Sequence, residues 1–131
     1  MEAKGGVNES TCLMTATENG HLAICRLLID KGAQLEAKGN YEFTSLHRAA
    51  IKGHVEIVRL LCNRGADVEA RTNDGRRPLH WAAIYGRISV VKELIEERNA
   101  EINARINDGN TALRYVRHDV SAYLVSHGGI L

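Results

Sequence analysis

One stretch of this chain occurs twice. Residues 46–70 read LHRAAIKGHVEIVRLLCNRGADVEA, and residues 79–104 read LHWAAIYGRISVVKELIEERNAEINA. The two copies start 33 residues apart, and the same register extends back to Leu13 without a gap. Self-similarity at a fixed period of this length is typical of a repeat protein, in which each copy is one supersecondary unit. The repeat therefore constrains the fold more than any local motif does.

A fourth copy is displaced and short. Leu113 follows Leu79 by 34 residues, and we expect the extra residue beside Asn99. The copy begins at Thr111 and reaches its terminal glycines about a helical turn early. We expect a single domain over residues 1–131, with repeats at about 11–43, 44–76 and 77–110 and a shortened repeat at 111–131.

Each copy carries the periodicity of two short amphipathic helices. In the second copy, Leu46, Ala49 and Ala50 share the i, i+3, i+4 spacing of one helix face, and the second half of the copy repeats that spacing. Gly53 separates the two halves, and Gly65 stands where a left-handed C-cap favours glycine. These signals predict a helix–turn–helix unit.

Start and turn signals agree with this pattern. Thr44 precedes the first helix as an N-cap, and Pro78 stands in the first helical turn of the next copy. Helices this short are not stable alone in water, so the copies must stack. Turn signals at Asp74-Gly75 and in residues 107–110 predict a finger loop between copies. The fold class is therefore an all-α solenoid of stacked helix pairs with β-hairpin-like fingers.

The second copy also resembles a known family. Residues 44–75, TSLHRAAIKGHVEIVRLLCNRGADVEARTNDG, are similar to the ankyrin repeat at the T-x-L-H opening, the A-A pair, the G-H turn, the I-V-x-L-L helix and the G-A-D-V ending. The resemblance covers about residues 2–129. It implies an ankyrin solenoid whose fingers and first helices line a concave groove that binds a protein. Departures from the pattern stand at Met14, Glu42, Arg77 and Arg114.

The histidines occupy repeated positions. His47 and His80 share one position of the repeat, and His21 and His54 share another. The resemblance implies that such histidines tie the turn regions together through hydrogen bonds. His21 and Cys25 have a two-ligand helical spacing, but no third or fourth ligand is visible. We therefore expect structural histidines and no metal site.

Motifs of catalysis are missing from the sequence. The odd set Cys12, Cys25 and Cys62 has no C-x-x-C pair and is interpreted as reduced structural thiols. No phosphate-binding glycine loop, nucleophile elbow or H-E-x-x-H helix occurs. The acidic run at 93–97 is interpreted as a solvated helix face. We expect no cofactor and no enzymatic activity.

The resemblance places candidate binding residues at the finger tips and on the exposed side of the first helices. Trp, Tyr and Arg dominate binding hot spots, and the only Trp and only Phe fall among these positions. An alternative is that Tyr41 and Phe43 fold back to replace packing lost at the Glu42 turn. The candidates are Tyr41, Phe43, Arg48, Ile51, Lys52, Arg71, Asn73, Arg76, Trp81, Ile84, Tyr85, Arg105, Asn107 and Arg114.

Charge is balanced overall and uneven locally. Seventeen Lys and Arg against sixteen Asp and Glu give a net charge of +1. A basic groove facing an acidic partner is one hypothesis, and scattered solubilising charge is the alternative. The basic groove positions are Lys38, Arg48, Lys52, Arg71, Arg76, Arg105 and Arg114. The acidic positions expected at the back are Glu56, Glu93, Glu96, Glu97 and Glu101.

Three classes of function remain open. The first is a protein-binding module for a protein or peptide partner, which is acidic under the basic-groove hypothesis. The second is a scaffold piece of a longer array, since MEAKG at the start imitates LEAKG at 35–39. Nucleic-acid binding is disfavoured by the near-zero net charge. Without a long apolar run or a signal peptide, we expect an intracellular, cytoplasmic protein without membrane insertion, and the nucleus or delivery into another cell stay open as alternatives. We also expect a monomer with no small-molecule substrate.

Overall fold

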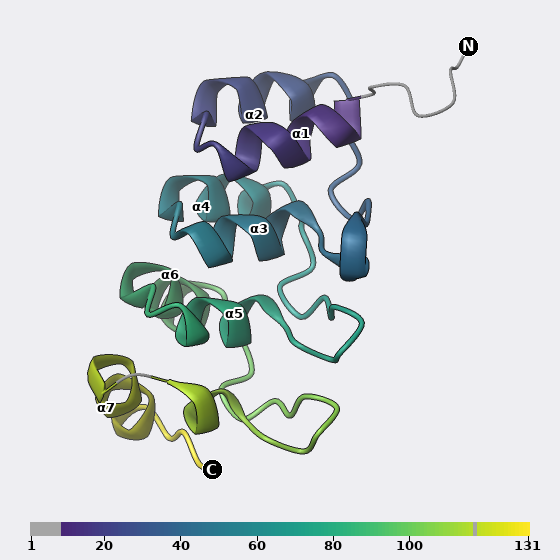
Figure 1. Ribbon diagram of the computed structural model, residues 1–131. Helices are drawn as coiled ribbons and strands as arrows, with labels where there is room; N and C mark the ends of the chain where they lie inside the picture. The colour runs from purple at the N-terminus through teal and green to yellow at the C-terminus, as the bar shows by residue number, and fades with distance from the viewer. Residues whose placement is uncertain (1–8, 117) are drawn as a thin grey trace.

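The computed structural model describes residues 9–116 and 118–131, which form helices and turns without a strand. The α-helices are α1 (Glu9–Glu18), α2 (Leu22–Asp30), α3 (Ser45–Lys52), α4 (Val55–Asn63), α5 (Pro78–Ile84), α6 (Ile88–Lys92) and α7 (His118–Ser126) (Figure 1). The short turns are η1 (Asn40–Glu42), the π-helical η2 (Glu93–Glu97) and the 3₁₀-helical η3 (Ala112–Tyr115). None of the described helices is long and apolar enough to cross a lipid bilayer.

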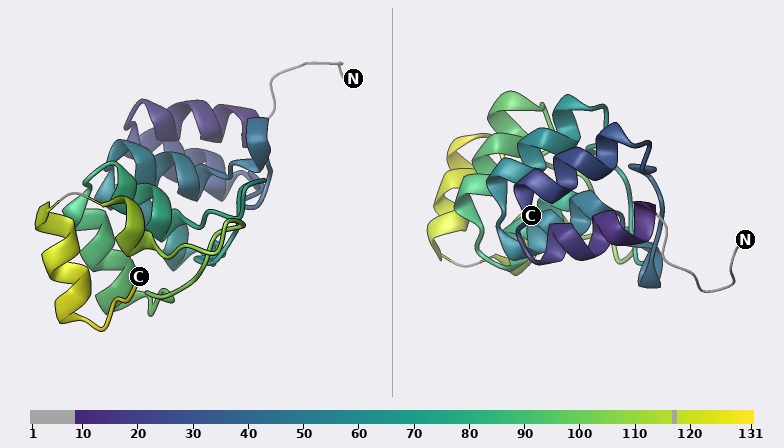
Figure 2. Two further views of the ribbon diagram at one scale, coloured as in Figure 1. Left: turned by 60° about the horizontal axis from the view of Figure 1, so that its bottom comes forward. Right: turned by 90° about the horizontal axis from the view of Figure 1, so that it is seen from above.

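The helices stack in two layers. The first helices of the copies, α1, α3, α5 and η3, pack in sequence against one another, and the second helices α2, α4, α6 and α7 form the other layer. Figures 1 and 2 show the layers side by side, with the loops between copies projecting to one side. The predicted all-α solenoid of stacked helix pairs is confirmed.

Small side chains fill the space between neighbouring first helices. Ala49 and Ala50 on α3, and Ala82 and Ala83 on α5, are fully buried. Between the layers, large apolar side chains complete the core, as at Leu46 of the T-x-L-H motif. Alanine lets adjacent helix backbones approach closely, so each copy buries its apolar face against the next.

The predicted helix ends are confirmed. Thr44 is the N-cap of α3, and its hydroxyl accepts from the His47 N–H. Pro78 opens α5, where no intrahelical N–H is needed. Gly53 ends α3 with φ 77°, and Gly65 follows α4 with φ 97°, both in the left-handed region.

His47 and His80 join parts of the fold as the resemblance implied. His47 Nδ1 accepts from the Thr44 N–H at 3.0 Å, and its Nε2 donates to the Ala70 carbonyl at 2.8 Å. His80 bonds to the Arg77 N–H at 2.9 Å and the Ala104 carbonyl at 2.9 Å. Burial lowers the pKa of His47 to about 4 and also lowers the pKa of His80. Both rings are therefore neutral and structural.

A second repeated position links neighbouring copies. His54 Nε2 lies 3.3 Å from the Glu18 carbonyl, and Arg87 Nε donates to the Ile51 carbonyl at 2.8 Å. Each of these residues is the N-cap of a second helix, and its side chain reaches the end of the first helix in the preceding copy. His21 has the same position in the first copy, where it is exposed.

The thiols are buried to different extents. Cys25 is buried, with its sulfur 3.6 Å from the Thr17 hydroxyl, and Cys12 and Cys62 are half-buried and free. Burial raises the pKa of the Cys62 thiol to about 11, which keeps it protonated. Over the described ranges, no group of three His, Cys, Asp or Glu side chains could hold a metal ion.

The extra residue of the third copy enters a helix. Asn99 takes the left-handed position that Gly65 has in the second copy, with φ 56°. The insertion precedes it, in the π-helical turn η2, whose wider turn holds one residue more than an α-turn. The Ala100 N–H consequently bonds to the carbonyl of Leu94, six residues back. The expectation of an insertion beside Asn99 is corrected by this shift into the helix.

Glu93 contradicts the interpretation of residues 93–97 as a solvated face. Its side chain is buried, and its two oxygens accept from Arg59 Nε at 2.9 Å and Arg98 Nε at 3.1 Å. Glu93 also occupies the position of Leu60 in the preceding copy. A buried carboxylate held by two guanidinium groups thus connects α4 with η2.

Candidate functional site

Three fingers connect the copies and are closed in the same way. In each one a backbone N–H donates at 2.8–2.9 Å to the carbonyl four residues further on, at Gly39 and Phe43, Thr72 and Arg76, and Ile106 and Asn110. At the first tip, Glu42 takes the left-handed conformation, with φ 64°, that glycine has at Gly75. The fingers therefore have hairpin-like closure without strands.

Hydrogen bonds also join one finger to the next. The Asn73 N–H donates to the Tyr41 carbonyl at 3.0 Å, and the Asn107 N–H donates to the Asp74 carbonyl at 3.1 Å. The Asn107 side chain adds a bond to the Asn73 carbonyl at 3.3 Å. These bonds fix the fingers in a row beside the first helices.

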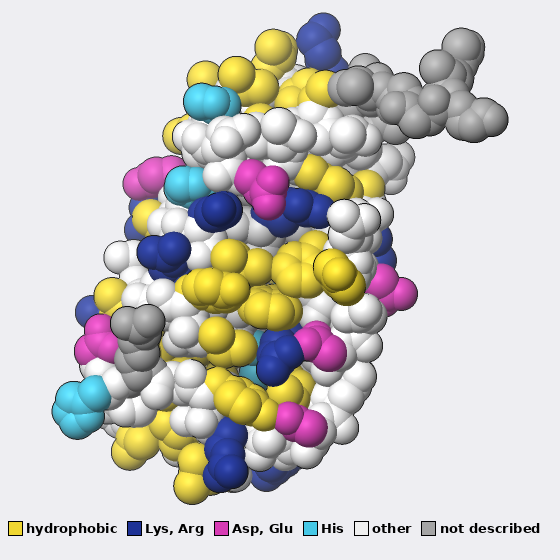
Figure 3. Space-filling model, viewed as in Figure 1, with side chains coloured by type: hydrophobic (Ala, Val, Ile, Leu, Met, Phe, Trp, Pro, Cys, Tyr) yellow, Lys and Arg dark blue, Asp and Glu magenta, His cyan; other side chains and the backbone are white. Residues whose placement is uncertain are grey.

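Aromatic rings run across the face formed by the first helices. Phe43 and Trp81 have ring centroids 5.0 Å apart, and Trp81 and Tyr85 follow at 6.3 Å. The Arg76 guanidinium lies 5.2 Å from the Trp81 ring centroid and 5.6 Å from that of Tyr115. We call Phe43, Arg76, Trp81, Tyr85 and Tyr115 the aromatic band. Figure 3 shows hydrophobic side chains gathered across the middle of this face.

Tyr41 and Phe43 differ in whether they fold back into the packing. Phe43 is half-buried and packs on Trp81 and on His47, whose ring centroid is 5.7 Å away. Phe43 thus serves packing as well as the exposed face. Tyr41 is 71% exposed and does not fold back.

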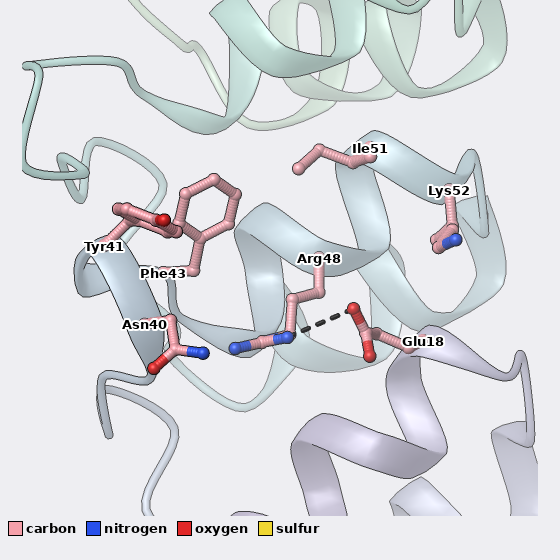
Figure 4. Close-up of a pocket in the computed structure, with 7 residues that line it drawn as sticks. All are labelled: Glu18, Asn40, Tyr41, Phe43, Arg48, Ile51 and Lys52. Atoms are coloured by element: carbon pink, nitrogen blue, oxygen red, sulfur yellow. Dashed lines mark hydrogen bonds and ion pairs between the residues drawn. The ribbon is translucent and has the colours of Figure 1, made fainter.

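A hollow of about 170 Å³ lies beside the band. Its lining includes Tyr41, Phe43 and Ile51 as apolar surface (Figure 4). Arg48 bonds to Glu18 at 3.1 Å within the hollow. Asn40 and Lys52 complete the lining, and both are exposed.

The basic residues of this face are largely paired. Arg48 pairs with Glu18, Arg76 with Asp74, and Lys38 lies 3.8 Å from Glu42. Acidic side chains therefore lie on this face too, beside the Lys and Arg groups seen in Figure 3. The expectation that the acidic residues gather at the back is incomplete for this reason. Within the described residues, the groove cations without an ion pair or side-chain hydrogen bond are Lys52, Arg71 and Arg114.

The remaining candidate binding residues lie outside the aromatic band and the first hollow. A second hollow, of about 480 Å³, runs along the fingers and is lined by Arg71, Asn73 and Asn107 together with several carboxylates. Arg105 donates to the Gly109 carbonyl at 2.7 Å in its own finger. Ile84 is half-buried on α5, at the position that Ile51 has on α3.

Tyr115 is a band residue that the sequence reasoning missed. It follows Trp81 by 34 residues and so occupies the Trp81 position of the fourth copy. Arg114, the residue predicted for the fourth copy, occupies the position of His80; it is exposed and makes no ring contact within the described part of the chain. The repeat register identifies Tyr115 as the residue equivalent to Trp81.

Trp81 contributes to the band through its ring rather than through its polar atom. Its Nε1 is buried and finds no hydrogen-bond acceptor among the described residues. A buried donor without an acceptor costs about 1–3 kcal/mol. The position therefore favours an aromatic surface and not an indole hydrogen bond.

Comparison with protein families identifies the repeat. Residues 2–72 match a model described as ankyrin repeats in three copies, and residues 74–104 match a model of a single ankyrin repeat. No curated protein matches the sequence.

Proposed function

Because the chain belongs to the ankyrin repeat family, we propose that it binds a protein partner across the aromatic band and the adjoining hollow. Ankyrin repeats are generally protein–protein interaction modules, and ankyrin repeat proteins are generally non-catalytic. The proposal locates that general role on one face of this chain.

The observation that carries the proposal is the continuity of the aromatic band. Tyr85 is 49% exposed and stacks on Trp81, which in turn packs on Phe43. Rings held by packing lose little conformational entropy when a partner covers them, and they supply large contact areas. The row of hydrogen-bonded fingers supports this rigidity at the edge of the face.

The hollow suggests the chemistry of the partner. Its volume of about 170 Å³ suits one apolar side chain, since an apolar cavity of roughly 150 Å³ holds benzene. Lys52 is the lining cation that keeps no ion pair within the described part of the chain. We therefore propose a partner segment that offers an apolar side chain with a carboxylate next to it.

The contribution of charge to this binding is small. Three of the seven groove cations already pair with carboxylates of this chain. An acidic partner would thus meet Lys52 and few other unpaired cations on this face. Burial of apolar surface supplies most of the affinity, and charge tunes specificity and association rate.

The test compares an exposed residue of the band and an exposed residue of the adjoining hollow with a distant residue. A partner isolated by affinity capture is purified, and its Kd is measured by calorimetry for the native chain and for Tyr41→Ala, Tyr85→Ala and Glu97→Ala. We expect at least a tenfold weaker Kd for Tyr85→Ala and a smaller loss for Tyr41→Ala, because Tyr85 is held in place by stacking on Trp81 and a few aromatic anchors carry most binding energy. Glu97 is exposed on η2, so its variant should bind within twofold of the native chain.

Salt provides an independent check. For protein binding with one or two cations engaged, we expect Kd to change less than tenfold between 50 and 200 mM salt. Nucleic-acid binding through six to ten phosphate contacts would weaken about 10³–10⁵-fold over the same range. Equal affinities of Tyr85→Ala and Glu97→Ala would exclude the band as the binding surface.

A further inference from the structure

The first end of the stack exposes side chains that are buried inside it. Ile24 on α2 is 48% exposed, whereas Ile57 and Val90, at the same position of the next copies, are 1% and 0% exposed. Leu27 is 53% exposed, whereas Leu60 is 7% exposed. Among the described residues, α4 and α6 each have a helix pair stacked before them, whereas α2 has none. The preceding pair is therefore what buries them.

Two polar positions of α2 show the same pattern. His54 and Arg87 reach back to a main-chain carbonyl of the preceding copy, but His21 is exposed and makes no such bond in the described part of the chain. Lys31 corresponds to Arg64, which binds Asp30 of the preceding copy at 2.8 Å.

The third copy also has a cation at the position of Arg64. Arg98 corresponds to Arg64 and bonds to Asn63 of the preceding copy at 2.8 Å. Lys31, by contrast, is exposed and has no ion pair among the described residues. Four positions that link copies inside the stack are thus unused at its first end. These are His21, Ile24, Leu27 and Lys31, which we call the N-terminal end face.

The other end of the stack is finished differently. Counting back from Gly128, which corresponds to Gly65, Ser121 occupies the fully buried position of Val58. A polar residue therefore stands where an interior copy has valine. Val125 is exposed, but it corresponds to Cys62, which is only half-buried within the stack.

The C-terminal tail also closes that end. Asn103 accepts from the Ile130 N–H at 2.8 Å and donates to the Gly128 carbonyl at 3.0 Å. The Gly129 N–H bonds to the Leu124 carbonyl at 2.7 Å. Terminal repeats normally present a polar outer face. At this end Ser121 supplies a polar side chain in place of valine, while Ile130 and Leu131 of the tail are exposed.

The sequence before α1 resembles the start of the first finger. Residues 2–5 read EAKG, as do residues 36–39, which lead from α2 toward α3. The three-copy family match likewise begins at residue 2, ahead of α1 at Glu9. This segment thus has the sequence that follows a second helix within the stack.

We propose that the N-terminal end face receives a further ankyrin-type helix pair, stacked in the register of the other copies. That pair supplies an apolar face against Ile24 and Leu27, a main-chain carbonyl for His21 and a carboxylate or amide for Lys31. The interface is separate from the aromatic band and does not depend on the proposed function.

The test inserts a second copy of the first repeat in register. The duplicated chain consists of residues 1–43 followed directly by residues 11–131, so that Phe43 precedes Thr11 as it now precedes Thr44. Thermal unfolding is followed by circular dichroism. We expect the midpoint to rise by about 5 °C or more, because the inner copy of the end face becomes covered.

Matched variants test whether the rise in the melting midpoint comes from covering the N-terminal end face. Ile24→Glu with Leu27→Glu in the inner copy should abolish the gain, and the same change in the outer copy should leave it. Equal effects of the two placements, or no gain from duplication, would overturn the proposal.

The unaltered chain distinguishes the other occupants. Ile24→Glu should change its melting midpoint far less than Ile57→Glu does. A loss as large as that of Ile57→Glu would mean that the chain itself covers the face. Dimers in sedimentation velocity that Leu27→Glu dissociates would mean that a second copy covers it, and either result would contradict the proposal.

Discussion

His47 shows how single residues hold this fold together. Its ring accepts from the N-cap residue of its own helix and donates to the carbonyl of Ala70, which lies in the next connecting segment. One neutral imidazole thus satisfies two main-chain groups, and His80 does the same one copy later. Protonation would place a second N–H against the Thr44 N–H, so the native state excludes the cation.

This arrangement predicts a loss of stability on acidification. The pKa of His47 is about 4 in the folded chain, below its value of 6.5 in the unfolded chain, so the unfolded state binds more protons between these values. The contribution of His47 to the free energy of unfolding is therefore complete near pH 7 and is lost as the pH drops through 6.5 toward 4. We expect a loss of about 2 kcal/mol from His47 between pH 7 and 5, measured by urea unfolding.

A double variant provides the control. His47→Gln with His80→Gln is less stable at pH 7 but should show a shallower pH dependence from pH 7 to 5. An unchanged slope would mean that other groups cause the acid sensitivity.

The repeat register predicts residues well where each copy has the same neighbours. It identified the buried alanines and the bridging histidines because their surroundings recur. Glu93 was missed because its burial depends on two arginines, one in the preceding copy and one beyond the inserted residue. Charge patterns along one helix do not reveal such partners.

Helices and turns differ in how far local sequence determines them. The ends of α3 follow from an N-cap threonine and a left-handed glycine. The π-turn η2 has no comparable signal, because it arises where one extra residue must fit between fixed neighbours. Similarly, η3 replaces a full first helix where the fourth copy is too short for an α-helix and a turn.

Substitutions of Glu93 and Glu97, both in the π-helical turn η2, should lower the free energy of unfolding by different amounts. Glu93→Ala should lower the free energy of unfolding by about 2 kcal/mol, because it leaves Arg59 and Arg98 without their shared carboxylate. Glu97→Ala is the control and should change it by less than about 0.5 kcal/mol, since Glu97 is exposed. Chemical unfolding measures both. Similar losses would show that the Glu93 pairs contribute no net stability.

At the scale of the whole molecule, stability is shared between neighbouring copies. First helices pack against the first helices of neighbouring copies, second helices pack against second helices, and the two helices of a copy pack against each other. In such an array each copy depends on its immediate neighbours, so the two ends open more readily than the middle. The capped C-terminal end is held by the side chain of Asn103.

Removing that cap should have a local effect. In Asn103→Ala we expect amide hydrogen exchange in α7 and η3 to become about tenfold faster, which corresponds to about 1.4 kcal/mol, with α1 to α4 unchanged. Asn19→Ala, which removes a side-chain bond to the Thr15 carbonyl at the other end, is the control and should leave α7 unchanged. A uniform increase along the chain would contradict the nearest-neighbour description.

The short reach of the links between copies bears on how the chain folds as it is synthesised. The finger bonds and the bonds from His54 and Arg87 connect residues at most 36 apart. A growing chain therefore needs about two repeats outside the ribosome, roughly 70 residues, before its first interface can close. Each later repeat then folds onto a finished surface, so nascent apolar faces are exposed only for the time needed to add one more repeat.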